Sequence, residues 1–276
     1  KNHKIIGYDI DKKIKGVIKQ DTLLNPPNYT NKWVITNPPY LSRNKNKIKD
    51  LYDKYDLNDL YKISIKTIFG CNGGILIIPL NFFSGEDFKL RNEFLSNYSI
   101  IKMNIFEESV FDDTDYTVCA FSFIKSKQKI QIINANIFPY NKNIELKISL
   151  KNNFVIGSEF FNLIKNGNIL NIKRLVQNKK QSLEINKNQT NLIPNSNIYL
   201  RAIDTGSGDG RISLSLNDTH FYAKETDRTF ATIILDKEYT KEQQQFICNK
   251  FNDTLEYYRN KYNSLFLTNY RNSSKS

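Results

Sequence analysis

The chain has 276 residues, of which 40 are lysine or arginine and 28 are aspartate or glutamate, so its formal net charge is +12. Hydrophobic residues make up 39% of the sequence, which is enough for the core of one large domain or of two ordinary ones. No apolar stretch reaches the ~18 residues that a membrane-spanning helix needs, and no secretory leader is recognisable. The composition therefore excludes a helical membrane protein and favours a cytoplasmic protein without a membrane partner.

The surplus of positive charge suits a polyanionic partner. Each lysine or arginine that meets a phosphate releases a counterion and thereby strengthens binding. A lysine-rich solvated surface encoded by an AT-rich genome gives the same surplus. The charge therefore permits a nucleic-acid partner without identifying one.

The three cysteines, Cys71, Cys119 and Cys248, are isolated in the sequence and lack the paired spacing of a zinc site. Their odd number also argues against a disulfide framework. We expect them to be reduced core residues, and we expect no metal.

Strands and helices alternate in the pattern of the first 125 residues. Short apolar runs, several of which end at acids or prolines, predict strands at residues 4–10, 17–21, 33–40, 75–79, 100–106 and 117–125. Apolar residues at helical spacing predict helices at residues 11–16, 50–69 and 86–97. Such alternation predicts a doubly wound α/β sheet, to which residues 130–150 add further strands.

The composition and the hydrophobic pattern of the sequence change after residue 150. Residues 177–191 are rich in asparagine, glutamine and lysine and predict a loop or linker. Residues 197–235 predict strands, with GSGDG at 206–210 favouring a hairpin turn over a phosphate-binding nest. Residues 240–266 are amphipathic and predict a long helix. We therefore expect an α/β part at 1–150 and an α+β part at 151–276.

The motif Asn37-Pro38-Pro39-Tyr40 stands at the carboxyl end of a predicted strand, the edge at which open α/β sheets bind ligands. The Asn37 side-chain oxygen and the Pro38 carbonyl can accept two hydrogen bonds from an amine of low nucleophilicity and stabilise positive charge as it reacts. The Tyr40 ring offers a face on which a flipped base can stack. Rigid prolines would hold these groups in place. An ordinary turn at a strand end is the alternative interpretation.

Residues 1–125 resemble the gamma-type DNA adenine-N6 methyltransferases, a class that includes bacterial modification enzymes and combined restriction–modification enzymes. The resemblance rests on the order of five motifs. These are GYDID at 7–11, KQDTLL at 19–24, NPPY at 37–40, DLY at 59–61 and GGILIIPLNFF at 73–83. It implies a Rossmann-like methyltransferase sheet, S-adenosylmethionine as the cofactor, double-stranded DNA as the partner, and a bacterial, phage or viral origin.

The resemblance also implies roles for three polar residues near strand ends. Asp9 would hold the ribose hydroxyls of the cofactor, Asp21 would meet its adenine amino group, and Asn37 would contact cofactor and substrate. A carboxylate suits the first two positions because it accepts from hydroxyls and amines. Alternatively, Asp9 and Asp11 can cap a helix, and Asp21 can cap a turn.

The loop at 110–118 lies where the family places an aromatic residue on the second face of the flipped base. Phe111 and Tyr116 are the candidates, although either can instead be a core residue. The basic segment at 42–47 can grip phosphates beside the pocket or form a surface loop.

One family feature has no counterpart in this sequence. A glycine-rich loop, which receives the methionine end of the cofactor, precedes the acid-ended strand in the family, and nothing before Lys4 can supply it. We expect an upstream polypeptide segment to supply this loop. The methyltransferase domain at 1–150 is then partial, truncated at its N-terminus, and residues 151–276 are expected to form a target-recognition and DNA-binding region.

Two other functions remain open at this point. The first is a catalytically inactive, methyltransferase-like DNA-binding subunit, which the missing loop favours. The second is a protein-glutamine N-methyltransferase, which shares the NPPY motif but needs neither the basic charge nor the second half of the chain. The NPPY motif is also compatible with an enzyme whose substrate is RNA instead of DNA.

Overall fold

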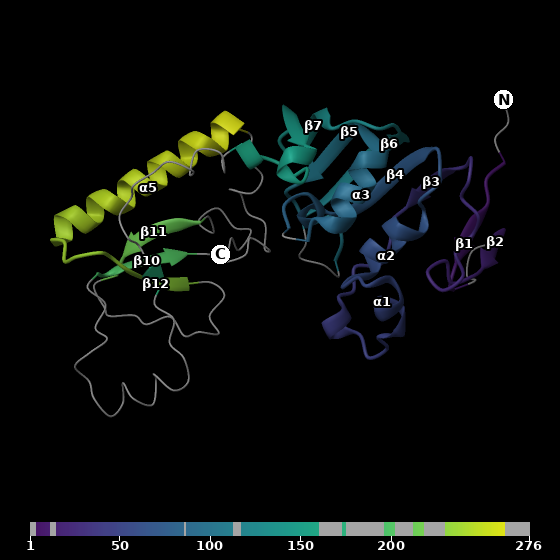
Figure 1. Cartoon of the computed structure of the whole chain (residues 1–276), viewed down its shortest axis with the longest axis horizontal. Coiled ribbons are helices and arrows are strands. Elements are labelled where there is room, and N and C mark those ends of the chain that lie inside the picture. Colours follow the sequence, from purple (N-terminus) through teal and green to yellow (C-terminus); the bar gives the residue numbers. More distant parts are fainter. Residues whose placement is uncertain are drawn as a thin grey trace. The chain divides into compact units, whose positions relative to one another are not determined.

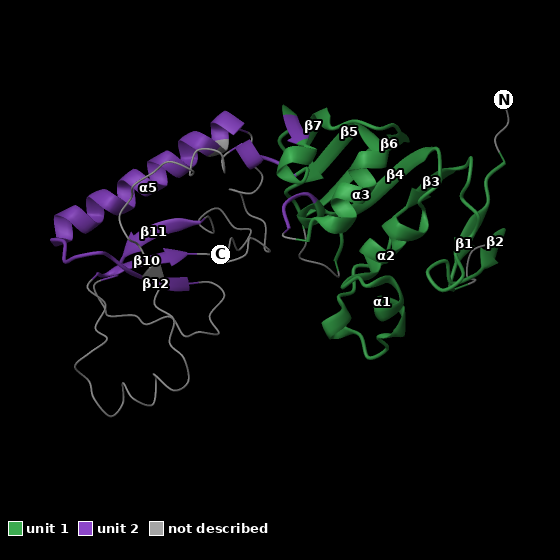
Figure 2. Cartoon of the chain, viewed as in Figure 1, with its two compact units in different colours: residues 1–82, 87–145, 149–154 green, residues 83–86, 146–148, 155–276 purple. Residues whose placement is uncertain are grey.

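The computed structural model of the chain describes residues 4–11, 15–85, 87–112, 117–159, 173–174, 196–201, 212–217 and 230–262 (Figure 1). The chain divides into two compact units (Figure 2). The first unit comprises residues 1–82, 87–145 and 149–154, and the second comprises 83–86, 146–148 and 155–276. Within the described ranges, every helix falls short of the length or the apolarity that crossing a bilayer demands.

A mixed six-stranded sheet is the main element of the first unit. Its strands are β3 (Trp33–Thr36), β4 (Gly73–Pro79), β5 (Tyr98–Phe106), β6 (Val118–Lys125), β7 (Ile130–Phe138) and β8 (Lys142–Ser149), in the order β3-β4-β6-β5-β7-β8. β3 is parallel to β4, and β6 is antiparallel to both β4 and β5. β3, β4 and β5 therefore run in one direction and end at the same edge of the sheet. The mixed α/β class agrees with the sequence prediction.

One face of this sheet forms the hydrophobic core. Apolar side chains of β4, β5 and β6, such as Leu76, Met103 and Phe121, are almost completely buried. The helix α3 (Lys89–Asn97) covers this face, since the ring of its Phe94 lies 5.2 Å from that of Phe123 (Figure 1). Short 3-10 turns follow β4 at Leu80–Phe83 and β8 at Leu150–Asn152.

The opposite face carries exposed apolar side chains. The strand register places Trp33 and Ile35 of β3 on the same face as Ile75 of β4 and Ile124 of β6. All four are exposed, Trp33 by 63% and Ile35 by 78%. β3 is also the terminal strand of the sheet. Sheets with parallel strands usually bury both faces, whereas among the described residues this edge and face present an exposed hydrophobic surface.

Two parallel strands, β1 (Gly7–Asp9) and β2 (Val17–Lys19), form a separate small sheet. Of the helix predicted at 11–16, Lys15 and Gly16 lie in a turn, and residues 12–14 lie outside the described residues. The loop after β2 is anchored by Leu23, which packs against Tyr52 and Ile63.

The single helix predicted at 50–69 is wrong. The structure has two helices, α1 (Asp50–Tyr55) and α2 (Leu60–Thr67), and the 3-10 turn Arg43–Lys45 precedes them. Asp56 adopts a left-handed conformation with φ of 52°, which ends α1. Asp59 then caps α2, because its side chain accepts from the backbone N–H of Tyr61.

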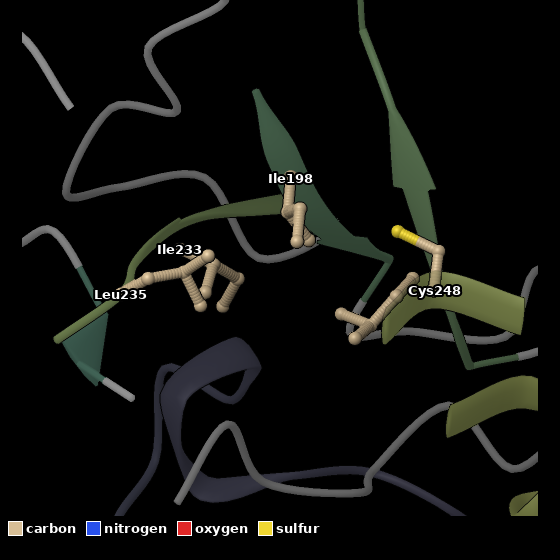
Figure 3. Close-up of a cluster of buried hydrophobic side chains, with 5 residues drawn as sticks. Ile198, Ile233, Leu235 and Cys248 are labelled. Carbon is tan, nitrogen blue, oxygen red and sulfur yellow. The ribbon is translucent and has the colours of Figure 1, made fainter. Parts of the chain in front are cut away.

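The second unit contains a small sheet and the long helix α5 (Lys241–Tyr262). The strands β9 (Lys173–Arg174), β10 (Ile198–Arg201), β11 (Ser213–Leu216) and β12 (Phe230–Ile234) lie in the order β11-β10-β12-β9. Ile198, Ile233, Leu235 and Cys248 form its buried cluster together with Leu214 (Figure 3). β10, β11, β12 and α5 agree with the sequence prediction, β9 was not predicted, and the GSGDG segment lies outside the described residues.

Candidate active site at the carboxyl edge of the sheet

The NPPY motif follows β3 directly. Thr36 is the last residue paired with β4, and Asn37 is the first residue beyond it. Proline donates no backbone hydrogen bond, so the chain leaves the sheet at Pro38. The Pro38 side chain is buried, Asn37 and Pro39 are exposed, and Tyr40 is half-buried. The motif thus presents the Asn37 amide to solvent from a rigid, partly buried turn.

The Tyr40 hydroxyl connects this turn to the neighbouring strand. Its oxygen lies 2.7 Å from Oδ1 of Asn37 and 2.9 Å from the backbone carbonyl oxygen of Ile77 in β4. These contacts bring the catalytic candidate Asn37 and the stacking candidate Tyr40 together.

Three aromatic rings meet at this edge. The Tyr40 ring packs edge-on against Tyr61 and Phe111, with centroids 6.3 Å apart in both pairs. Phe111 lies in the loop after β5, as the sequence analysis expected, and is half-buried. Tyr116, the other candidate of that loop, lies outside the described residues.

Two residues of this cluster were not assigned a role from the sequence. Tyr61 comes from α2, and its hydroxyl donates to Oδ1 of Asn81 at 3.1 Å. Asn81 follows the end of β4, so each of the parallel strands β3, β4 and β5 contributes a residue near its carboxyl end. Both lie in segments that carried the family resemblance, DLY and GGILIIPLNFF, and those segments were the available signal.

Backbone hydrogen bonds fix the segment after Tyr40. The N–H of Leu60 donates to the carbonyl of Leu41 at 3.1 Å, and the N–H of Arg43 donates to that of Asn58 at 2.9 Å. A bridge also pairs Ser42 with Asp59. The start of α2, which carries Tyr61, is therefore tied to the NPPY turn.

Asp59 is a half-buried carboxylate in this segment. Burial raises its pKa from 3.8 to about 6, although backbone N–H donors and the nearby Lys62 ammonium oppose the shift.

In the basic segment at 42–47, the Arg43 guanidinium contacts Asp53 at 2.8 Å. Arg43 is thus already engaged with a carboxylate.

The two acidic cofactor candidates belong to the β1–β2 sheet. Asp9 ends β1, is exposed, and accepts from the N–H of Asp11 at 2.8 Å. Asp21 follows β2, and its Oδ1 accepts from the N–H groups of Leu23 and Leu24 at 2.9 and 3.0 Å. Asp21 therefore caps a turn, as one sequence interpretation allowed, and the ligand roles of both acids stay predictions.

Acidic, histidine and cysteine side chains do not gather into groups of three or more that could hold a metal ion, as far as the described residues extend. Cys71, Cys119 and Cys248 are free and buried, as expected. Burial raises the pKa of each of these thiols, which disfavours the reactive thiolate. Within the described residues, the cluster around Tyr40 presents amide, hydroxyl and aromatic groups.

Fold and site together define a mixed α/β protein with a polar and aromatic cluster at the carboxyl edge of its parallel strands. Comparison with known protein families finds no match to this chain, and comparison with curated proteins finds none. Solved structures give matches at low similarity.

One similar structure is a modification subunit of a type I restriction enzyme from Vibrio vulnificus YJ016, with a TM-score of 0.35 and 14% identity over 46% of this chain and 30% of that chain. A second is the M protein of the type I restriction enzyme EcoKI, with a TM-score of 0.32 and 12% identity over 44% of this chain and 29% of that chain. A third is the type IIG restriction endonuclease BpuSI, with a TM-score of 0.36 and 13% identity over 89% of this chain and 36% of that chain. The chain spans about a third of the length of each.

Proposed function

We propose that this chain is the catalytic part of a DNA methyltransferase that transfers a methyl group from S-adenosylmethionine to N6 of a flipped adenine. The observation that carries the proposal is the edge cluster, in which the Asn37 amide and the Tyr40 ring stand together where β3 ends. A restriction–modification protein is the setting that the sequence resemblance favours.

The polar groups of the turn suit the chemistry of an aromatic amine. The lone pair of the adenine amino group is delocalised into the ring, so the amine is a poor nucleophile. Oδ1 of Asn37 and the carbonyl oxygen of Pro38 accept hydrogen bonds from its two N–H groups, orient the nitrogen lone pair, and stabilise the positive charge that develops on nitrogen. Such groups act by electrostatic preorganisation and need no general base.

The aromatic groups suit a base that has left the duplex. Stacking of a base on an aromatic side chain contributes about 1–3 kcal/mol, which offsets part of the cost of unstacking. Tyr40 supplies one ring, and Phe111 and Tyr61 flank it at the same edge. Phe111 is the candidate for the second face of the base.

Asp9 at the end of β1 and Asp21 after β2 suit part of the cofactor-binding site. The exposed Asp9 carboxylate can accept from ribose hydroxyls, and Asp21 retains acceptor capacity beside its turn bonds. Bound S-adenosylmethionine supplies an activated methyl group. The glycine-rich loop that would hold its methionine end is not recognisable in this sequence.

The open edge of β3 supports an upstream segment as the source of that loop. A strand added beside β3 satisfies its unpaired backbone edge, and a helix that follows the strand covers the exposed face with Trp33, Ile35 and Ile75. A turn between such a strand and helix lies at the carboxyl edge of the sheet, beside Asn37. One strand–loop–helix segment would thus complete both the fold and the site.

The net charge of +12 supports DNA as the partner, and we assign residues 151–276 to target recognition and residues 1–150 to catalysis. Base contacts give sequence preference, whereas lysine and arginine contacts to phosphate give affinity.

Methyl transfer to an adenine-containing duplex tests the proposal, with the chain joined to its upstream segment. Asn37→Ala removes an acceptor that acts on the transition state, so kcat should fall by about 10²-fold or more while DNA affinity is kept. Asn143→Ala, at an exposed asparagine of β8, is the matched control. Equal activity of Asn37→Ala and the parent would contradict the proposal. DNA binding without transfer in the parent would favour the inactive DNA-binding subunit.

A further inference from the structure

The Tyr40 hydroxyl lies between two acceptors but carries one proton. Its oxygen is 2.7 Å from Oδ1 of Asn37 and 2.9 Å from the carbonyl oxygen of Ile77. A phenol donates a single hydrogen bond and accepts others through its lone pairs. The hydroxyl can therefore donate a well-aligned hydrogen bond to Asn37 or to Ile77, but not to both at once.

The position of the hydroxyl follows from where β3 ends. Pairing between β3 and β4 stops at Thr36, opposite Leu76, so Ile77 is the first residue of β4 beyond the paired segment. The Tyr40 hydroxyl reaches the Ile77 carbonyl where β3 no longer runs beside β4. Tyr61 and Phe111 pack against the Tyr40 ring, so the ring stays in place. Rotation of the O–H bond alone then moves the proton from one acceptor to the other.

The direction of this proton controls the Asn37 amide. When the proton points to Ile77, lone pairs of the Tyr40 oxygen face Asn37. An amide oxygen 2.7 Å away is then repelled, whereas an amide nitrogen in that position donates a hydrogen bond. The amide therefore turns, places Nδ2 toward Tyr40, and releases Oδ1 for another donor.

We propose that the Tyr40 hydroxyl is a positioning group that decides which end of the Asn37 amide faces the target base. This inference rests on the proposed function. In the empty site the hydroxyl donates to Oδ1 of Asn37. With the target adenine present, the hydroxyl donates to the Ile77 carbonyl, Nδ2 of Asn37 donates to the Tyr40 oxygen, and Oδ1 accepts from the adenine amine. Each donor keeps an acceptor in both states, and no covalent bond changes.

The kinetics of Tyr40→Phe test this role in the chain joined to its upstream segment. The variant keeps the ring and its stacking, so KM for DNA should stay unchanged. Loss of one neutral hydrogen bond that orients the amide should lower kcat by roughly two- to tenfold. Tyr55→Phe is the matched control, because the Tyr55 hydroxyl also donates to a backbone carbonyl, that of Leu23 at 3.4 Å, and should leave kcat unchanged.

A double-mutant cycle separates a positioning role from a general structural one. In the Asn37→Ala background the hydroxyl has no amide to orient, so Tyr40→Phe should cause no further fall in single-turnover rate. An equal fall in both backgrounds, or no fall in either, would overturn the proposal.

The same cycle on thermal unfolding of the free chain is independent of methyl transfer. Non-additive Tm shifts of Tyr40→Phe and Asn37→Ala are expected, because the two side chains are hydrogen-bonded in the empty site. Additive shifts would overturn the pairing. Coupled shifts in a protein that transfers no methyl group would instead refute the proposed function while leaving the bond between hydroxyl and amide established.

Discussion

The raised pKa of Asp59 makes the stability of the segment around the NPPY turn depend on pH. Burial raises this pKa from 3.8 to about 6, so between these values the folded protein binds a proton that the unfolded chain has released. The contribution of Asp59 to stability is therefore fully present below about pH 4 and is lost as pH rises through about 6. A shift of about two pKa units corresponds to about 3 kcal/mol, at ~1.36 kcal/mol per unit.

Asp59→Asn removes the titration but keeps the helix cap, since asparagine caps helices as well as aspartate does. Urea unfolding at pH ~3 should give similar free energies of unfolding for variant and parent, whereas at pH ~7.5 the variant should be more stable by up to about 3 kcal/mol. Asp56→Asn, which changes an exposed carboxylate, controls for the loss of charge. A constant difference between Asp59→Asn and the parent across this pH range would refute the reasoning.

Three further predictions concern the base pocket, the open edge and the second half of the chain. Tyr40→Ala should lose most methyl transfer, because it removes the ring that stacks on the base; full activity in a transfer assay would contradict this role. Trp33, the only tryptophan, should give a red-shifted, quencher-accessible fluorescence in the free chain and a blue shift once the proposed upstream segment is attached; unchanged emission would mean that the proposed segment does not cover β3. Removing residues 151–276 should abolish the preference for a cognate over a scrambled duplex while cofactor binding is kept. If the truncated and the full chain show the same preference at two salt concentrations, recognition lies outside residues 151–276.

Local patterns predicted the elements that position the site. The apolar run before two prolines predicted a strand at 33–40 that leaves the sheet at the prolines, and the observed β3 ends at Thr36, directly before the motif. The break between α1 and α2 was missed because the apolar spacing of residues 50–69 continues through it. The polar residues Asp56, Asn58 and Asp59 carried the opposing signal, since they favour left-handed turns and helix caps.

Contacts between residues that are far apart in the sequence could not be predicted from the local sequence pattern. Tyr61 and Asn81 are 20 residues apart and meet because α2 and the end of β4 approach the same edge. The hydrogen bond from Tyr40 to the Ile77 carbonyl depends on where the pairing of β3 with β4 stops, which is a property of the sheet. Such contacts decide which polar atoms are free to bind a ligand, so sequence motifs located the site without giving its hydrogen bonding.

The uncovered face of the sheet explains one mismatch between sequence and structure. The continuous run Ile75-Leu76-Ile77-Ile78 predicts a strand that is buried on both sides, yet Ile75 is exposed while Leu76 and Ile78 are buried. A solvent-facing strand surface selects polar residues, because exposed isoleucines on a flat sheet edge promote aggregation. Trp33, Ile35 and Ile75 therefore have the composition of a covered face. The sequence of β3 and β4 is that of interior strands, which is the physical reason for placing a further strand and helix beside β3.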